Sequence, residues 1–409
     1  MESRSSLSGE VVYIEGCDSR LGVEDLPEKI PLYKPQNVVG EEVLDEIRKV
    51  LESGWLTMGP KTEEFERIFA NYVGCKYGVA NHSCTSALYL ALEALGIKEG
   101  DQVVVPVLTF AATANVVKWI GAEPIFCDVA EDGVINIAKL ENLLKTNDKI
   151  RCVIPVHLYG YPCDMRKISR LVKEYSVKMV EDCAQSHGAT VDDKKVGSFG
   201  DAGCFSFYAT KNVTTGEGGM LVTDNKKIRD RAFLVRSHGQ TKTPKEKVAD
   251  WWYDIIDLGF NFRMSEIEAA IGIKQMERID SMIESRRKIA RMYKEELEKI
   301  GGIEMLHAPE SDSFRQGVYH LLVVKVEKEY PLTRDKLYMH LQKNGIIAGV
   351  HFPPLHYFSY YKRITKYKKG DFPQAERLYS KILSLPMFPY MKTQEFQKII
   401  KVIKSKALP

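Results

Sequence analysis

The chain has 409 residues, of which 44% are hydrophobic and 28% charged, and its formal net charge is +3. This length predicts two domains, or one large domain with a smaller one attached, and the composition is ordinary for a soluble globular enzyme. The small net charge argues against nucleic acid or an anionic membrane as a partner. The 8 cysteines are scattered without a Cys-x-x-Cys motif or a metal-type His/Cys grouping, which predicts reduced thiols, no metal site and a cytoplasmic protein.

The N-terminal part of the chain predicts an extension followed by two helices. Residues 1–29 are polar, show little periodicity and lack the apolar core of a signal peptide. From Glu41 apolar residues recur at helical spacing, and Gly54 ends the run. A second helix is predicted to start with Thr62 as its N-cap and to end at Gly74.

The middle of the chain alternates between two kinds of segment. Short apolar or β-branched runs lie near residues 77–80, 102–106, 123–127, 150–156 and 178–181. Amphipathic segments lie between them, near residues 85–95, 111–119, 136–145 and 164–175. This rhythm predicts an α/β fold whose mostly parallel sheet is covered by helices on both faces. The next runs, 204–208 and 220–223, are separated by a Thr/Gly-rich turn, which predicts a strand of reversed direction.

The last third of the chain predicts a long helical stretch and a smaller domain. Ser265 and Glu268 have the spacing of a capping box, which opens a helical pattern that runs, with one break allowed, to about Ile300. Mixed strand and helix patterns follow. We therefore expect an N-terminal extension (1–29), a large domain (30–285) and a smaller C-terminal α+β domain (286–409).

Two residues at the ends of strand-like runs suggest a specific chemistry. Lys211 follows the apolar run 204–208, and Asp182 follows the run 178–181. Most lysines are solvated surface charges, and a strand-end carboxylate is often solvated too. A lysine at the end of a buried strand is partly desolvated, which lowers its pKa and makes it a nucleophile and proton carrier. A Schiff-base amine and a carboxylate that keeps a pyridine nitrogen protonated are what pyridoxal 5′-phosphate (PLP) chemistry requires.

A phosphate group needs a helix N-terminus and hydroxyl groups. The turn formed by Ser83, Cys84 and Thr85 ends one strand-like run and opens an amphipathic helix, so it is the candidate phosphate site. Ser206 adds a hydroxyl from the strand before Lys211. Serines and threonines also cap helices routinely, so this pattern alone is weak.

Two further residues are candidates for contact with the cofactor ring. Gln185 is expected to face the ring or its phenolic oxygen, and Phe110, at the end of the run 103–109, to stack on it. A plain core aromatic is the commoner role for such a phenylalanine. Glu181, next to Asp182, is expected to have a structural role.

In these motifs the chain resembles the PLP-dependent nucleotide-sugar aminotransferases of the DegT/DnrJ/StrS group, which have the aspartate-aminotransferase fold (fold type I). The likeness extends from about Ile30 to the C-terminus. The segments that carry it are 53–60, 83–88, 109–115, 181–185, 197–201, 205–219, 261–264, 349–352 and 370–373. The resemblance implies a large PLP-binding domain with a mostly parallel sheet and a smaller α+β domain.

The resemblance also implies roles for single residues at the cofactor. Lys211 matches the lysine that holds the cofactor, Asp182 the partner of the pyridinium nitrogen, and Gln185 a neighbour of the ring. Ser206 and the turn 83–85 match phosphate ligands. Cys84 stands where many relatives have glycine, which adds bulk near the phosphate but keeps the backbone N–H.

Other matches concern the substrate and a second subunit. Asn261 matches a phosphate ligand donated by the other subunit, and Arg263 its companion, so the resemblance implies a homodimer with shared active sites. Thr57 and His351 match positions that line the sugar pocket. Phe352 stands where a tyrosine is common, which removes a hydroxyl near the substrate.

The activity implied is transfer of an amino group from a donor, expected to be L-glutamate, to a nucleotide-linked keto-sugar. One alternative is a PLP-dependent sugar dehydratase, but in that branch a histidine replaces the lysine that this chain keeps at position 211. Another is a non-catalytic regulatory protein of the same fold. The intact lysine, aspartate and phosphate residues argue against it.

Overall fold

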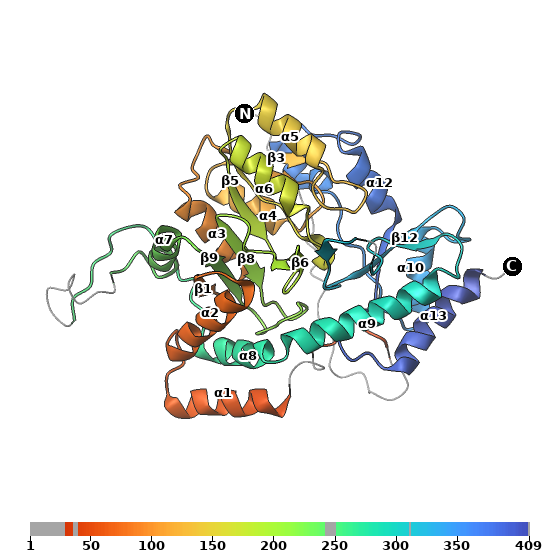
Figure 1. Cartoon of the computed structure of the whole chain (residues 1–409), viewed down its shortest axis with the longest axis horizontal. Helices are drawn as coiled ribbons and strands as arrows, with labels where there is room; N and C mark the ends of the chain where they lie inside the picture. The colour runs from red at the N-terminus through yellow and green to blue at the C-terminus, as the bar shows by residue number, and fades with distance from the viewer. Residues whose placement is uncertain (1–28, 36–39, 242–250, 311, 408–409) are drawn as a thin grey trace, which may run out of the picture.

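The computed structural model describes residues 29–35, 40–241, 251–310 and 312–407. Its centre is a seven-stranded sheet with the order β1-β9-β8-β5-β4-β2-β3 (Figure 1). The strands are β1 (Tyr77–Asn81), β2 (Gln102–Pro106), β3 (Glu123–Cys127), β4 (Ile150–Val153), β5 (Lys178–Asp182), β8 (Ala202–Ser206) and β9 (Gly219–Thr223). Each predicted strand run is present.

The direction of the strands confirms the predicted mostly parallel sheet. From β3 through β2, β4 and β5 to β8 every pairing is parallel. Strand β9 is antiparallel to both β8 and β1, which is the predicted reversal after the Thr/Gly-rich turn.

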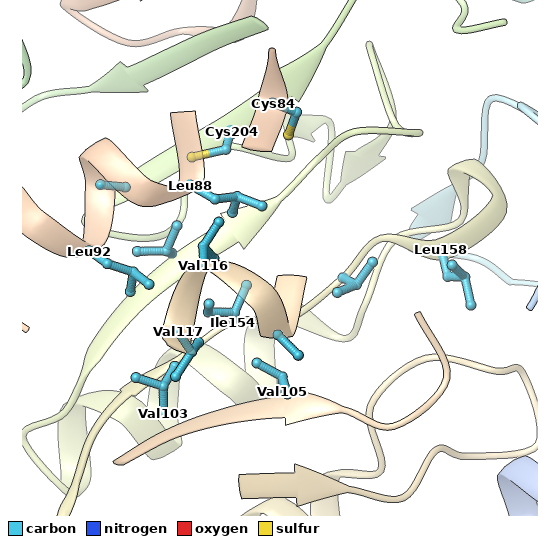
Figure 2. Close-up of a cluster of buried hydrophobic side chains, with 14 of the residues drawn as sticks. Cys84, Leu88, Leu92, Val103, Val105, Val116, Val117, Ile154, Leu158 and Cys204 are labelled. Carbon is cyan, nitrogen blue, oxygen red and sulfur yellow. The ribbon is translucent and has the colours of Figure 1, made fainter. Parts of the chain in front are cut away.

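Helices cover both faces of this sheet because its strands are apolar on both sides. Val103 and Val105 of β2 belong to one buried cluster, and Val104 between them belongs to another on the opposite face. Figure 2 shows the first cluster, in which side chains of α3 and α4 meet those of β2. The helices of this part are α1 (Glu41–Ser53), α2 (Pro60–Val73), α3 (Cys84–Ala94), α4 (Ala112–Trp119), α5 (Ile137–Thr146), α6 (Met165–Glu174) and α7 (Lys226–Arg236).

The first helix is as predicted, but the predicted start of the second is wrong. Helix α2 begins at Pro60, and Thr62 lies inside its first turn with 1% of its surface exposed. The carboxylate of Glu266 accepts hydrogen bonds from the backbone N–H groups of Gly59 (2.9 Å), Lys61 (2.7 Å) and Thr62 (2.8 Å). The helix is therefore capped by a residue about 200 positions away, and the Thr62 hydroxyl also donates to it (2.7 Å).

The predicted capping box is confirmed. Ser265 accepts from the N–H of Glu268, and the Glu268 carboxylate accepts from the Ser265 N–H in return. Helix α8 (Glu266–Met276) and helix α9 (Ile279–Leu297) follow, so the single allowed break is also present. Figure 1 shows α9 running from beneath the central sheet to the C-terminal elements.

The C-terminal part has the predicted α+β composition. A three-stranded antiparallel sheet has the order β10-β12-β13. Its strands and helices are β10 (Ile303–Met305), β12 (Leu322–Val326), α10 (Arg334–Lys343), α11 (Ser359–Ile364), α12 (Pro373–Lys381), β13 (Ile382–Leu385) and α13 (Thr393–Ala407). A second small sheet joins β11 (Arg315–Gln316) to β6 (Thr190–Val191) and β7 (Lys194–Lys195), and short 3₁₀ turns span Leu158–Gly160 and Leu355–Tyr357.

The predicted domain limits stay a prediction. The limit at residue 285 falls inside the continuous helix α9, and residues from α9 onward form a third buried cluster that also contains Ile30. Residues 1–28 of the predicted extension lie outside the described part. In that described part, no helix has the length and apolar character needed to cross a membrane.

Candidate active site

A cavity of about 380 Å³ lies at the carboxyl ends of the central strands, where α/β sheets bind their ligands. Nine of the residues that the sequence predicts for the site line it: Ser83, Cys84, Thr85, Phe110, Asp182, Gln185, Ser206, Lys211 and His351. They come from the turn before α3, the segment after β2, the ends of β5 and β8, the turn after β8, and the C-terminal part.

Lys211 lies in the turn between β8 and β9. Its backbone N–H donates to the carbonyl of Tyr208 at 2.8 Å, which fixes the turn, and its side chain lines the cavity. Burial lowers the pKa of Lys211, and the negative charge of Asp182 acts in the opposite direction. The amine therefore loses its proton more readily than a surface lysine does, as a nucleophile and proton carrier needs.

Asp182 ends β5 and is 5% exposed. Its two oxygens accept hydrogen bonds from the Thr113 hydroxyl (2.8 Å) and from the backbone N–H of Ala184 (3.1 Å). Burial raises the pKa of Asp182, whereas both donors and the Lys211 charge lower it. The Thr113 hydroxyl also lies 3.1 Å from that of Thr109, so Thr109 contacts Thr113 rather than the carboxylate.

Glu181, the neighbour of Asp182, points to the other side of the strand and has the expected structural role. It is fully buried, and it accepts the backbone N–H groups of Gly197 (2.8 Å), Phe199 (2.7 Å) and Gly200 (2.8 Å). The Nε2 of His157 lies 3.1 Å from it. Through these hydrogen bonds Glu181 holds the loop before β8 against the end of β5.

The carboxylate of Glu181 also belongs to a group of side chains that could be considered as metal ligands. Glu181, His157 and Cys183 are close enough to be considered a metal-ligand group. However, both Glu181 oxygens already accept backbone N–H groups. Nδ1 of His157 accepts from the N–H of Cys163 at 3.0 Å. Glu181 and His157 therefore already use these atoms in hydrogen bonds within the protein.

The turn before α3 has the features of an anion site. Ser83 is the N-cap of α3, and the first N–H groups of the helix, those of Cys84 and Thr85, have no intrahelical acceptor. Gly219 lies so close that a Cβ on it would be 2.2 Å from the carbonyl carbon of Ser83. Only glycine allows the β9 backbone to approach the turn in this way, with the Ser206 hydroxyl on the adjacent strand.

Gln185 and Phe110 both line the cavity. The side-chain carbonyl of Gln185 accepts the backbone N–H of Tyr159 at 2.6 Å, which leaves its amide N–H groups for a ligand. Phe110 is 60% exposed, so it is not a plain core aromatic, and its ring centroid lies 5.7 Å from that of Phe352.

Three predicted residues do not line this cavity within the single chain. Thr57 and Asn261 are exposed, and Arg263 is half-buried. The segment that carries Asn261 nevertheless lies beside the anion site, because the carbonyl of Phe262 accepts the backbone N–H of His82 at 3.0 Å. The roles of these three residues stay predictions.

The structure also brings together residues that the sequence reasoning missed. Thr109 and Thr113 lie in the motif 109–115. The hydroxyl residues of that motif were the signal in the sequence that could have indicated them. Tyr33 and His320 also line the cavity, although they are far in sequence from the strand-end motifs, and no local sequence pattern indicates them.

The residues present fit PLP. An amine with a lowered pKa, a buried carboxylate held by two donors, and a helix N-terminus with nearby hydroxyls are what its aldehyde, ring nitrogen and phosphate require. These three features converge on one cavity at the carboxyl ends of a mostly parallel sheet. Fold and site together define a PLP-dependent enzyme of the aminotransferase fold.

Comparison with known proteins agrees with this assignment. Residues 37–404 match the DegT/DnrJ/EryC1/StrS aminotransferase family. The spore coat polysaccharide biosynthesis protein SpsC of Bacillus subtilis is 37% identical over 384 residues, covering 93% of this chain and 96% of SpsC. The GDP-perosamine synthase of Escherichia coli O157:H7 is 36% identical over 368 residues, covering 90% and 95%.

A structural comparison gives the same result. Spr1654 of Streptococcus pneumoniae is solved in PLP and pyridoxamine phosphate (PMP) forms. Its PMP form superimposes with a TM-score of 0.85 at 28% identity, covering 94% of this chain and 99% of Spr1654. The chain therefore belongs to the DegT/DnrJ/EryC1/StrS aminotransferase family and is a PLP-dependent aminotransferase.

Proposed function

We propose that this aminotransferase transfers the amino group of L-glutamate to the ketone of a nucleotide-linked keto-sugar, and that it works as a homodimer with shared active sites. The sugar substrate is supported by relatives such as GDP-perosamine synthase and a UDP-4-amino-4,6-dideoxy-N-acetyl-β-L-altrosamine transaminase, which is 34% identical. Glutamate is the donor expected from the family resemblance.

The observation that carries the proposal is the convergence of Lys211 and Asp182 on one cavity. Bound PLP supplies an aldehyde that takes up the amino group and a ring that withdraws electrons from the carbon that loses a proton. The Lys211 amine holds the cofactor and, once free, carries a proton to and from the reacting carbon. Asp182, kept in place by Thr113, keeps a positive charge favourable at the ring nitrogen. The presence of lysine at 211 favours amination over deoxygenation.

The experiment that tests this activity follows both half-reactions. We expect the purified holoenzyme to change its absorbance on addition of L-glutamate and to form one 2-oxoglutarate per amino-sugar when nucleotide-linked keto-sugars are supplied, with the product identified by mass. A deoxygenated sugar without net glutamate consumption would instead support the dehydratase. No absorbance change with any amino acid would support the non-catalytic alternative.

The homodimer is supported by exposed apolar side chains in the loop that precedes Asn261 in the sequence. Residues 251–258 belong to a loop that extends away from the sheet beside α7 (Figure 1). Trp251 is 78% exposed and Leu258 80%, which is unusual for large apolar side chains that remain in water. Asn261 follows this loop in the sequence. When the loop packs against a second copy of the chain, it therefore brings Asn261 toward the active site of that copy.

Mixing two inactive variants tests the shared site. Lys211→Ala removes the amine, and Asn261→Asp places a negative charge where a phosphate is expected, so each variant alone should be inactive. A mixed dimer contains one intact site if Asn261 acts across the interface. Remixing equal amounts should then restore up to about a quarter of wild-type activity. No recovery, with mixed dimers demonstrated by subunit exchange, would exclude the shared site.

The cellular location stays a prediction of a cytoplasmic protein. All seven cysteines in the described part of the chain are free, and all are buried. Free thiols persist in reducing compartments, which supports the prediction. Localisation of the tagged protein by fractionation tests it.

A further inference from the structure

The imidazole of His351 is fixed in the cavity wall by contacts on several sides. Its Nδ1 lies 2.9 Å from the hydroxyl oxygen of Ser384, and the hydroxyl of Tyr159 donates to its backbone carbonyl. The ring of Phe352 packs edge-on, with centroids 5.1 Å apart. A Cβ at Gly349 would lie 2.6 Å from the ring carbon Cε1, so a glycine is what leaves room for the ring.

Ser384 is unusual in its surroundings. It is the one polar residue of β13, whose other members are Ile382, Leu383 and Leu385, and it is 1% exposed. Its backbone N–H and carbonyl are both paired with Gly349, at 2.7 and 3.0 Å. Within the described part of the chain, His351 is the hydrogen-bond partner of its hydroxyl. A buried serine in an apolar strand is therefore committed to one imidazole nitrogen.

This pairing selects one tautomer of the ring. If Nδ1 carried the proton and donated to Ser384, the serine hydroxyl hydrogen would be buried without an acceptor, which costs about 1–3 kcal/mol. If the serine donates to Nδ1, both groups are satisfied and the proton lies on Nε2. Burial, together with the charge of Lys211, lowers the pKa of His351 to about 4, so the ring is neutral near pH 7.

We infer that Ser384 is a positioning residue, which holds His351 with Nε2–H free to donate to an oxygen of the sugar substrate. The inference rests on the proposed function and deepens it. His351 and Lys211 line the same cavity, so the part of a substrate that reaches His351 is the reacting sugar rather than the nucleotide. A neutral N–H donor recognises an acceptor oxygen, such as a ketone or hydroxyl, and is not a base.

The tautomer is measured directly by ¹⁵N NMR of histidine-labelled holoenzyme without substrate, with the His351 signals assigned by their loss in His351→Gln. We expect an unprotonated Nδ1 and a protonated Nε2. In Ser384→Ala, the Nδ1 signal should shift because its hydrogen bond is lost. A protonated Nδ1 in the wild type, or an Nδ1 signal that Ser384→Ala leaves in place, would overturn the inference.

Kinetics give the second measurement. Ser384→Ala should raise KM for the keto-sugar about threefold to tenfold, while the glutamate half-reaction keeps its rate. Ser380→Ala is the matched control, because Ser380 is exposed on α12 and its hydroxyl donates to the carbonyl of Arg377 on the same helix. An unchanged KM, or equally weakened inhibition by the free nucleoside diphosphate, would contradict a contact with the sugar.

The two proposals fail in distinguishable ways. If the wild-type enzyme aminates no keto-sugar, the proposed function fails, but the NMR experiment still reports the tautomer. If keto-sugars are aminated and the proton lies on Nδ1, only the role of Ser384 fails.

Discussion

The residues that line the cavity fall into two groups, which are built in different ways. The strand-end group consists of Asp182, Ser206 and Lys211, which end or follow two neighbouring strands of one sheet. The distant group combines Tyr33 from the N-terminal segment with His351 from the C-terminal part. Strand order alone brings the first group together, whereas the second depends on packing between segments that are distant in the sequence. We infer that the strand-end group performs the amino transfer and that the distant group selects the substrate.

Removing the amine of Lys211 from the strand-end group should have the largest effect. We expect Lys211→Ala to lower turnover by at least about 10²–10⁴-fold, since proton transfer by a positioned group contributes that much. Turnover with glutamate and the keto-sugar is the measurement, with circular dichroism to verify folding. Lys401→Ala, an exposed lysine of α13, is the control. Near-normal turnover of Lys211→Ala would remove the basis for the assignment.

Neutralising the carboxylate of Asp182 should have the second-largest effect. Asp182→Asn retains the shape of the side chain and an oxygen that accepts from Thr113 or Ala184, but it loses the charge that favours a protonated ring nitrogen. An adjacent opposite charge shifts a pKa by about 1–3 units, so the glutamate half-reaction should slow by about 10- to 1,000-fold. Stopped-flow absorbance measures it. Half-reaction rates equal to the wild type would exclude this role for Asp182.

Removing the hydrogen bond from Thr113 to Asp182 should slow the reaction less than removing the charge of Asp182. Thr113→Val preserves shape and removes one hydrogen bond to a charged group, worth about 1.5–3 kcal/mol, so the half-reaction should slow by roughly tenfold to a hundredfold. Thr109→Val is the matched control, because Thr109 contacts Thr113 and not the carboxylate. We expect a smaller loss there. Equal losses in the two variants would mean that packing rather than the bond to Asp182 is affected.

The same contrast explains what the sequence predicts and what it does not. The sheet, Asp182 and Lys211 can be predicted from local patterns. The pattern of a strand shows where the strand ends, and the ligands of an α/β sheet bind at those ends. The cap of α2 does not, since Glu266 is brought to it by tertiary packing. Ser384 is likewise undetectable from its apolar strand alone. The role that we propose for Asn261 involves a second subunit, which patterns within one chain do not describe.

A change in the distant group should have the smallest effect, and it should separate sugar binding from the glutamate half-reaction most clearly. Tyr33→Phe removes a hydroxyl from a residue that lines the cavity and is 40% exposed. A neutral hydrogen bond is worth about 0.5–1.5 kcal/mol, so KM for the keto-sugar should rise by about twofold to tenfold. The glutamate half-reaction should be unchanged. Tyr360→Phe, at an exposed position of α11, is the control. If Tyr33→Phe slows the glutamate half-reaction as much as it raises the sugar KM, the distant group also acts in the chemical step, and the division between the two groups does not hold.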